Sequence, residues 1–129
     1  MELVNHYTQY TTTYGEYLAY VEHLVETDFA DSIEKEVAAR LTTTRETFET
    51  LMNQISTLEV EQEQEENLKD LKYLVMDALF LAGDLEQFYN YQEIGRFKMR
   101  VLNALNKKRR AEALGKFSEG SGSCPINNL

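Results

Sequence analysis

The chain has 129 residues, of which 43% are hydrophobic and 27% charged, so it is long enough for one domain with its own core and too apolar to be disordered throughout. An internal disulfide is excluded because the chain has a single cysteine, Cys124. A helix that crosses a bilayer needs about 20 consecutive apolar residues, and no stretch of the chain approaches this length. The net charge is -9, and the first six residues contain no Lys or Arg, so we expect a cytoplasmic protein without a secretory leader.

The charge is strongly segregated along the chain. Residues 1–95 carry 20 acidic and 5 basic side chains, for a net charge of -15, whereas residues 96–129 have a net charge of +6. The basic segment could serve an acidic partner, or it could lie against its own acidic neighbours. The second interpretation is favoured because the oppositely charged surface belongs to the same chain.

The first segment has the apolar spacing of a helix. Steps of three and four residues connect a set of side chains that share one helical face: Leu3, Tyr7, Tyr10, Tyr14, Tyr17, Val21 and Leu24. Gly15 and the β-branched run Thr11 to Thr13 weaken this prediction, and Thr13 with Glu16 matches a capping box. The stable helix could therefore begin only at Thr13.

A second helix is predicted after a break at 27–31, with Asp31 as N-cap and Glu34 completing a capping box. Its apolar face extends for about 27 residues, to Leu58. The stretch 59–67 contains five glutamates, which predicts a turn and the start of a third helix between Glu61 and Glu65. Because this stretch lacks Gly and Pro, one unbroken helix from Ser32 to about Tyr89 is an alternative, which would give a long helical hairpin forming an intermolecular coiled-coil dimer.

The third helix is the most apolar, and we expect it to be the most buried. A phase slip in the apolar pattern predicts a turn at 89–93, after which a fourth helix runs to about Leu114 with Gly115 as C-cap. The prediction is thus an all-α domain at 1–115, an antiparallel up-down four-helix bundle, followed by a flexible tail at 116–129. The tail is rich in Gly and Ser, and part of it resembles an engineered linker.

The motifs for metal and phosphoryl chemistry are incomplete. A di-iron bundle needs Glu-x-x-His pairs, and neither His6 nor His23 follows a Glu by three residues. His23 as a phosphoacceptor would lie beside two glutamates that repel a phosphoryl group. We therefore predict no catalytic residue, no metal ligand, no cofactor and no small-molecule substrate.

An all-α metal-dependent nucleotide pyrophosphohydrolase remains an alternative function. Such an enzyme needs Glu-x-x-Glu on one helix and Glu-x-x-Asp on another, so that neighbouring carboxylates share Mg²⁺ ions. Glu46 with Glu49, and Glu63 with Glu66, match the first half. The second half has no match in the chain.

The fourth helix carries a candidate basic patch, made up of Arg96, Lys98, Arg100, Lys107, Lys108, Arg109 and Arg110. A regulator that contacts nucleic acid through this helix is a second alternative. It is disfavoured because a chain with a pI near 4.7 repels phosphates over the rest of its surface.

The row of tyrosines is the most distinctive feature of the sequence. Five of the eight tyrosines fall within fourteen residues, and four of them share the apolar face of the first helix: Tyr7, Tyr10, Tyr14 and Tyr17. Tyrosine combines a large apolar ring with a hydroxyl that needs a hydrogen bond, so it suits half-wet boundaries and protein interfaces. The rings could simply cover the bundle, or they could bind a partner.

These observations favour a non-enzymatic interaction module, an adaptor, chaperone-like or regulatory protein that acts through helical surfaces. The expected partner is another protein or a second copy of the chain in a homodimer. Neither nucleic acid nor a membrane is the expected partner. This expectation rests on analogy of size, charge and missing chemistry, with no family motif behind it.

Overall fold

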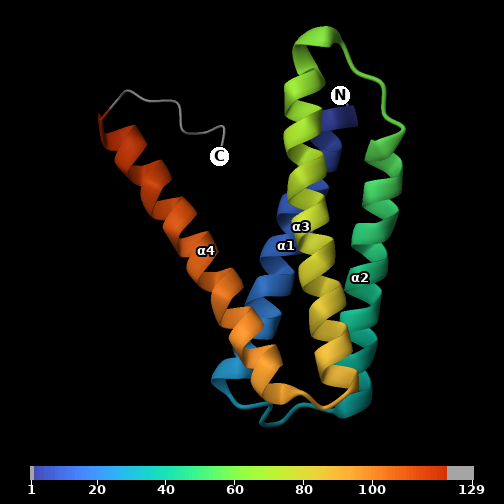
Figure 1. Ribbon diagram of the computed structural model, residues 1–129, viewed down its shortest axis with the longest axis vertical. Coiled ribbons are helices and arrows are strands. Elements are labelled where there is room, and N and C mark those ends of the chain that lie inside the picture. The colour runs from blue at the N-terminus through green and yellow to red at the C-terminus, as the bar shows by residue number, and fades with distance from the viewer. Residues whose placement is uncertain (1, 122–129) are drawn as a thin grey trace.

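The computed structural model describes residues 2–121, with the side chains of residues 2–113, and shows four helices that pack together (Figure 1). They are α1 (Glu2–Glu26), α2 (Glu34–Ser56), α3 (Glu65–Asn90) and α4 (Ile94–Ser121), with the short 3-10 helix η1 (Gln62–Gln64) before α3. Consecutive helices run in opposite directions, so the predicted all-α, antiparallel bundle is confirmed. The alternative of one helix through α2 and α3 is excluded because the chain reverses after Ser56.

α1 is a single helix from Glu2, so the alternative start at Thr13 is wrong. The hydroxyl of Thr11 donates a hydrogen bond to the carbonyl of Tyr7, at 2.8 Å, one turn earlier. This bond accommodates a threonine hydroxyl within the helix. Leu3 and Tyr10, both buried, hold the first turns of α1 against the core.

The loop from α1 to α2 begins with a Schellman motif, although it contains no glycine. The amide of Asp28 donates to the carbonyl of Val25 at 3.1 Å, and the amide of Phe29 donates to the carbonyl of Leu24 at 2.8 Å. Asp28 and Phe29 both have positive φ angles, of 52° and 63°. The ring of Phe29 packs between Tyr89 and Phe97, at centroid distances of 5.8 and 5.4 Å, which offsets the cost of this backbone conformation.

The predicted N-cap at Asp31 is wrong. Asp31 has a φ of 61°, and the residue that precedes α2 in the cap position is Ile33, whose side chain cannot cap. The capping-box spacing does not apply because Asp31 takes a left-handed backbone conformation, whereas an N-cap residue has extended backbone angles. The hydroxyl of Ser32 instead donates to the carbonyl of Phe29, at 2.6 Å.

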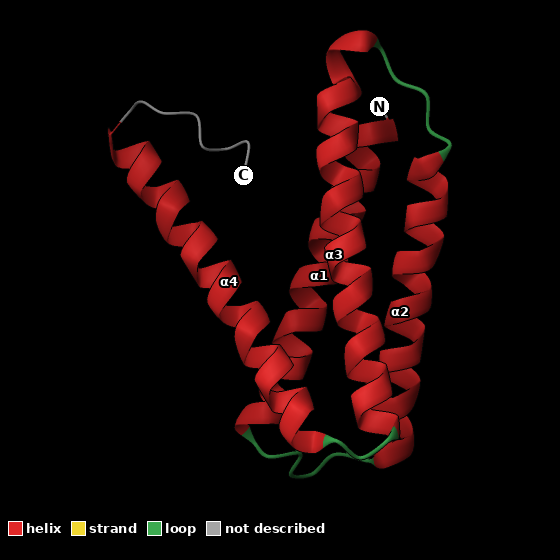
Figure 2. Cartoon of the chain, in the orientation of Figure 1, coloured by secondary structure: helices red, strands yellow, loops and turns green. Residues whose placement is uncertain are grey.

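The other two connections occur where the sequence predicts them (Figure 2). α3 ends in a second Schellman motif, in which the amide of Glu93 donates to the carbonyl of Phe88 at 2.7 Å and Gln92 takes a φ of 58°. The link from α2 to α3 is the longest loop and passes through η1, which lies in the glutamate-rich stretch.

The core contains apolar side chains from all four helices together with the rings of Tyr10 and Tyr17, and no charged side chain is buried among the described residues. Within that part of the chain, α3 contributes the most buried residues, as predicted: Leu68, Leu71, Val75, Ala78, Leu81, Ala82 and Leu85. α2 and α3 share the most extensive contact, along most of their length. α2 and α3 are therefore the most closely associated pair of helices in the bundle.

α4 joins the bundle only with its first half and then diverges from it (Figure 1). Phe97, Val101, Ala104 and Leu105 are buried, whereas every described side chain from 106 to 113 is exposed. The helix continues through Gly115 to Ser121, so the predicted end at Leu114 is wrong. A glycine in a helix costs only about 1 kcal/mol and does not by itself end it.

The remainder of the predicted tail, 122–129 with Cys124, lies outside the described residues. Among the helices that the structure describes, none is both long and apolar enough to cross a membrane.

Candidate protein interface

The structure separates the four predicted tyrosines of α1 into different environments. Tyr10 and Tyr17 are buried, with 9% and 2% of their surface exposed, Tyr14 is half-buried, and Tyr7 is 52% exposed. Tyr10, Tyr14 and Tyr17 surround the ring of Phe48 from α2, at centroid distances of 6.5, 6.4 and 6.3 Å. Three of the rings therefore belong to the contact between α1 and α2, and only Tyr7 presents most of its ring to solvent.

Tyr17 carries a buried hydroxyl with no hydrogen-bond partner among the described residues. Burial raises the pKa of Tyr17 and of Tyr10, because the charged phenolate is poorly solvated inside the bundle. Their neighbours Tyr14 and, for Tyr17, Glu86 add to the shift by repelling a second negative charge. Both side chains stay neutral in the folded protein well beyond the ordinary range of tyrosine.

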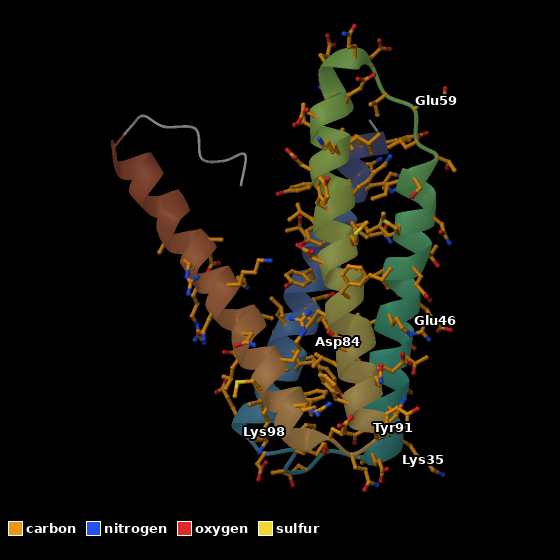
Figure 3. The ribbon with its side chains drawn as sticks, viewed as in Figure 1. Lys35, Glu46, Glu59, Asp84, Tyr91 and Lys98 are labelled. Atoms are coloured by element: carbon orange, nitrogen blue, oxygen red, sulfur yellow. The ribbon has the colours of Figure 1, made fainter. Side chains whose placement is uncertain are left out.

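The predicted basic residues of α4 mostly bind acidic residues of the same chain. Four of them reach other elements: Lys98 binds Asp28, Arg100 binds Asp84 at 3.0 Å, Lys107 binds Asp77 at 3.6 Å and Arg109 binds Glu22 at 3.2 Å. Figure 3 shows Asp84 between α3 and the first half of α4, and Lys98 at the lower end of α4. Arg96 pairs with the adjacent Glu93 at 3.3 Å. Each exposed pair adds at most about 1 kcal/mol, but together they orient α4 on the acidic body.

Lys108 and Arg110 differ from the other five basic residues. Both are exposed, and neither forms an ion pair with the side chains that the structure describes. They lie on the diverging half of α4. Carboxylates of the same chain therefore pair with five of the seven basic residues of the patch, and Lys108 and Arg110 are left without such a pair among the described side chains.

A groove of about 640 Å³ lies between α1 and α3, on the side from which α4 diverges. Its apolar lining consists of Leu3, Val4, Tyr7, Leu71, Tyr73 and Leu74. Val4, Tyr7 and Tyr73 are each more than half exposed. We call this feature the α1–α3 groove. It gathers three large exposed apolar side chains in one place, whereas isolated exposed apolar residues are normal on protein surfaces.

Carboxylates border the α1–α3 groove. Asp70 and Asp77 line it from α3, and the ion pair between Asp77 and Lys107 marks its lower end. Its upper end adjoins a hollow that is lined by Glu2, Glu59 and Glu61. Figure 3 places Glu59 in the loop at that end of the bundle. The site is therefore an apolar channel with an acidic margin.

The sequence pattern predicts Tyr7 as a contact residue, but it does not predict Val4, Tyr73 or the groove itself. The signal for Tyr73 was present, because its ring lies outside the main apolar stripe of α3 and because the apolar residues there cover more than half of the helix. Phe80 and Tyr91, also on or just after α3, are likewise exposed. What the sequence could not reveal is that α4 leaves this face of α3 uncovered.

A second polar cluster joins α2 to α3. Arg45 donates to the carboxylate of Glu86 at 2.5 Å, Thr42 donates to the same carboxylate at 2.5 Å, and Arg45 also binds Glu49 at 2.5 Å. Burial alone would raise the pKa of Glu86, but the hydrogen bonds from Arg45 and Thr42 outweigh it and hold this pKa below its usual range. The cluster fixes the two helices in register.

The two glutamate pairs considered for metal binding lie on different elements. Glu46 is exposed on the outer side of α2 (Figure 3), and Glu49 is paired with Arg45. Glu63 lies in η1 and Glu66 in the first turn of α3. In the part of the chain that the structure describes, no group of three or more His, Cys, Asp or Glu is placed to hold a metal ion.

Comparison with protein family models, with curated proteins and with solved structures finds no match to this chain.

Proposed function

We propose that the chain is a non-enzymatic protein interaction module, acting in the cytoplasm, which binds a helix of a partner protein in the α1–α3 groove. The observation that carries this proposal is the exposure of Val4, Tyr7 and Tyr73 together in one groove. A helix laid along such a groove buries its apolar face and leaves its polar face in water. Tyrosine rings provide large contact area with little loss of side-chain entropy.

The margin of the groove indicates the charge of the partner. Asp70 and Asp77 lie on α3, and Glu2, Glu59 and Glu61 follow at the upper end. A partner helix with Lys or Arg beside its apolar stripe would be steered to this site and held in register. We therefore expect an amphipathic helix with basic flanks.

The ion pairs of α4 disfavour the alternative that this helix binds nucleic acid. Four basic side chains that would have to contact phosphates already bind carboxylates of the same chain. If α4 nevertheless binds duplex DNA, its affinity will fall steeply with salt, because bound phosphates release counterions. We expect no such binding at physiological salt.

The pyrophosphohydrolase alternative is tested separately. Such an enzyme requires Mg²⁺, so added Mg²⁺ would raise the melting temperature of the chain and nucleoside triphosphates would be hydrolysed. The ion pair of Glu49 with Arg45 favours the interpretation that the α2 glutamates are part of a solvated, salt-bridged face. We expect neither a stabilisation nor a turnover.

A site-specific photo-crosslink tests the interaction directly. A photoreactive amino acid is placed at Tyr73 in the groove and, as a matched control, at Thr50 on α2, which is also exposed but distant from the groove. We expect a discrete protein adduct from position 73 that is absent from position 50. Crosslinks that are equal at the two positions, or absent from position 73, would contradict the proposal.

A further inference from the structure

The α1–α3 groove and the second half of α4 both lack a helix packed against them. The α1–α3 groove is the place where the second half of the fourth helix would lie in a regular bundle, but α4 reaches it only with Lys107, at its lower end. The second half of α4, residues 106–121, extends away from the body, and all of its described side chains, 106–113, are exposed. We call this segment the α4 arm.

From this we infer that the occupant of the groove is the α4 arm of a second copy, so that two chains place their arms in each other's grooves in a symmetric dimer. The inference rests on the proposed function, since it names the partner of the same groove. Each chain then contributes one groove and one arm to the interface, as a two-fold axis requires. The reciprocal exchange covers both grooves and both arms at once.

The α4 arm cannot readily cover the groove of its own chain. The buried residues Phe97, Val101 and Ala104 define the inner face of α4, and the next two positions on that face are Lys108 and Ala111. Both are exposed. Because this face has no large apolar residue between 106 and 113, no apolar contact holds the arm on its own body. Only the ion pairs of Lys107 with Asp77 and of Arg109 with Glu22 link the described part of the arm to the body, and α4 diverges after Leu105.

The length of the arm fits the groove. Sixteen helical residues span about 24 Å, and the lining from Gln64 to Asp77 spans about 20 Å at the same rise per residue. The arm is the unpacked end of a longer helix, and in proteins most of the stability of a helix comes from packing of one of its faces. Packing against a second copy supplies the stabilisation that the arm does not obtain from its own body.

The charges also match between two copies. Lys108 and Arg110 on the arm form no ion pair with the described side chains of their own chain, whereas Asp70 lines the groove and Glu2 adjoins its upper end. In the exchanged dimer the basic arm lies along the acidic margin of the other copy. Opposite net charges on the two contacting surfaces favour this arrangement and raise the association rate.

The test is a measurement of mass in solution by analytical ultracentrifugation over a range of protein concentrations. We expect the wild-type chain, of 15.0 kDa, to sediment with twice that mass at the higher concentrations. Two variants reverse the charges separately: K108E/R110E on the arm, and D70K in the groove. Each should dissociate at least tenfold more readily than wild type, because each places like charges at both contacts.

Mixing the two variants provides the decisive measurement. In the mixed dimer the acidic arm of the K108E/R110E chain meets the basic groove of the D70K chain, and the basic arm of the D70K chain meets an unchanged groove, so both contacts become attractive again. We expect the mixture to restore the dimer, while E46K, the same type of charge change on the outer side of α2, leaves the wild-type dimer intact. All four substituted positions are exposed, and melting curves confirm that each variant folds.

Three results would overturn the inference: a wild-type monomer at every concentration, a dimer that the charge reversals do not weaken, or a mixture that does not reassociate. These outcomes are distinct from failure of the proposed function. A monomeric chain whose position 73 still crosslinks to a different protein would refute the exchange of arms and leave the groove as the binding site. A monomer with no crosslink from that position would refute both.

Discussion

The ring of Tyr17 on α1 meets the ring of Phe48 on α2 edge to face, with centroids 6.3 Å apart and planes inclined at 81°. Both side chains are buried, and the Tyr17 hydroxyl has no hydrogen-bond partner among the described residues. The packing of the ring stabilises the fold, whereas the isolated hydroxyl opposes it.

Replacing Tyr17 by Phe should therefore stabilise the protein. The change keeps the ring against Phe48 and removes a polar group that is buried without a hydrogen bond, which costs about 1 kcal/mol or more. We expect the free energy of unfolding in urea to rise by about 1 kcal/mol. Tyr7→Phe serves as the control, because the Tyr7 ring is half exposed and its hydroxyl can reach water. A loss of stability in the Tyr17 variant would show that the hydroxyl is hydrogen-bonded.

High pH should destabilise the bundle through the same tyrosines. The pKa of Tyr10 and of Tyr17 is raised in the folded state, whereas a tyrosine in the unfolded chain ionises at about pH 10. Above that pH the unfolded state has lost protons that the folded state keeps, so stability falls as the pH rises. Urea denaturation from about pH 8 to about pH 11 should show this fall, and the Tyr10→Phe/Tyr17→Phe double variant should show a smaller one. If the free energy of unfolding fell equally with pH in the wild type and in the double variant, Tyr10 and Tyr17 would not be the cause of the fall.

Glu86 should make the stability of the protein fall at low pH. Although burial opposes it, hydrogen bonding from Arg45 and Thr42 lowers the pKa of Glu86 in the folded state. The stability that this carboxylate supplies is therefore present above the pKa of an unfolded glutamate, about 4.3, and is lost as the pH falls below it. We expect Glu86→Gln to lower the free energy of unfolding at neutral pH by about 1–2 kcal/mol and to flatten its decrease between about pH 5 and pH 3.

The matched control for Glu86 is Glu49→Gln, which removes the more exposed carboxylate that Arg45 also binds. Urea denaturation over the same pH range measures both variants. If both changes altered the free energy of unfolding equally at each pH, the carboxylate of Glu86 would contribute no more to stability than that of Glu49.

The turn between α3 and α4 offers a stabilising substitution. Gln92 has a φ of 58°, in the left-handed region where a side chain with Cβ is disfavoured and glycine is not. Gln92→Gly should raise the free energy of unfolding by about 1 kcal/mol. Gln87→Gly, within α3, should lower it by a similar amount because glycine weakens a helix interior. Chemical denaturation measures the free energy of unfolding of both variants. A change of the same sign in both would contradict the prediction.

These turns also show where the sequence was informative. The apolar spacing and its phase slip were enough to predict the four helices and their three connections, because burial of one helical face dominates their formation. The N-cap was mispredicted because Asp31 and Glu34 have the spacing of a capping box, while the loop geometry depends on Phe29 packing against two other helices. Local signals describe an isolated helix end and carry no information about such distant contacts.

The candidate interface was predictable only in part. The concentration of tyrosines marked the correct helix, but the burial of Tyr10 depends on packing against Phe48, which lies far away in sequence. The basic residues of α4 were expected to lie against the acidic body, and four of them do so. The groove could not be foreseen, because it arises where α4 leaves the bundle after Leu105.

The divergence of α4 has a consequence for the local stability of its backbone. Amide hydrogens between Phe97 and Leu105 can exchange with solvent only when the helix leaves the core, whereas those beyond Asn106 need only the opening of an unsupported helical end. In a dilute solution the protection of amides from deuterium should therefore fall abruptly within one helix. Any binding event that covers this segment would slow exchange there first, which makes the end of α4 an internal reporter of association.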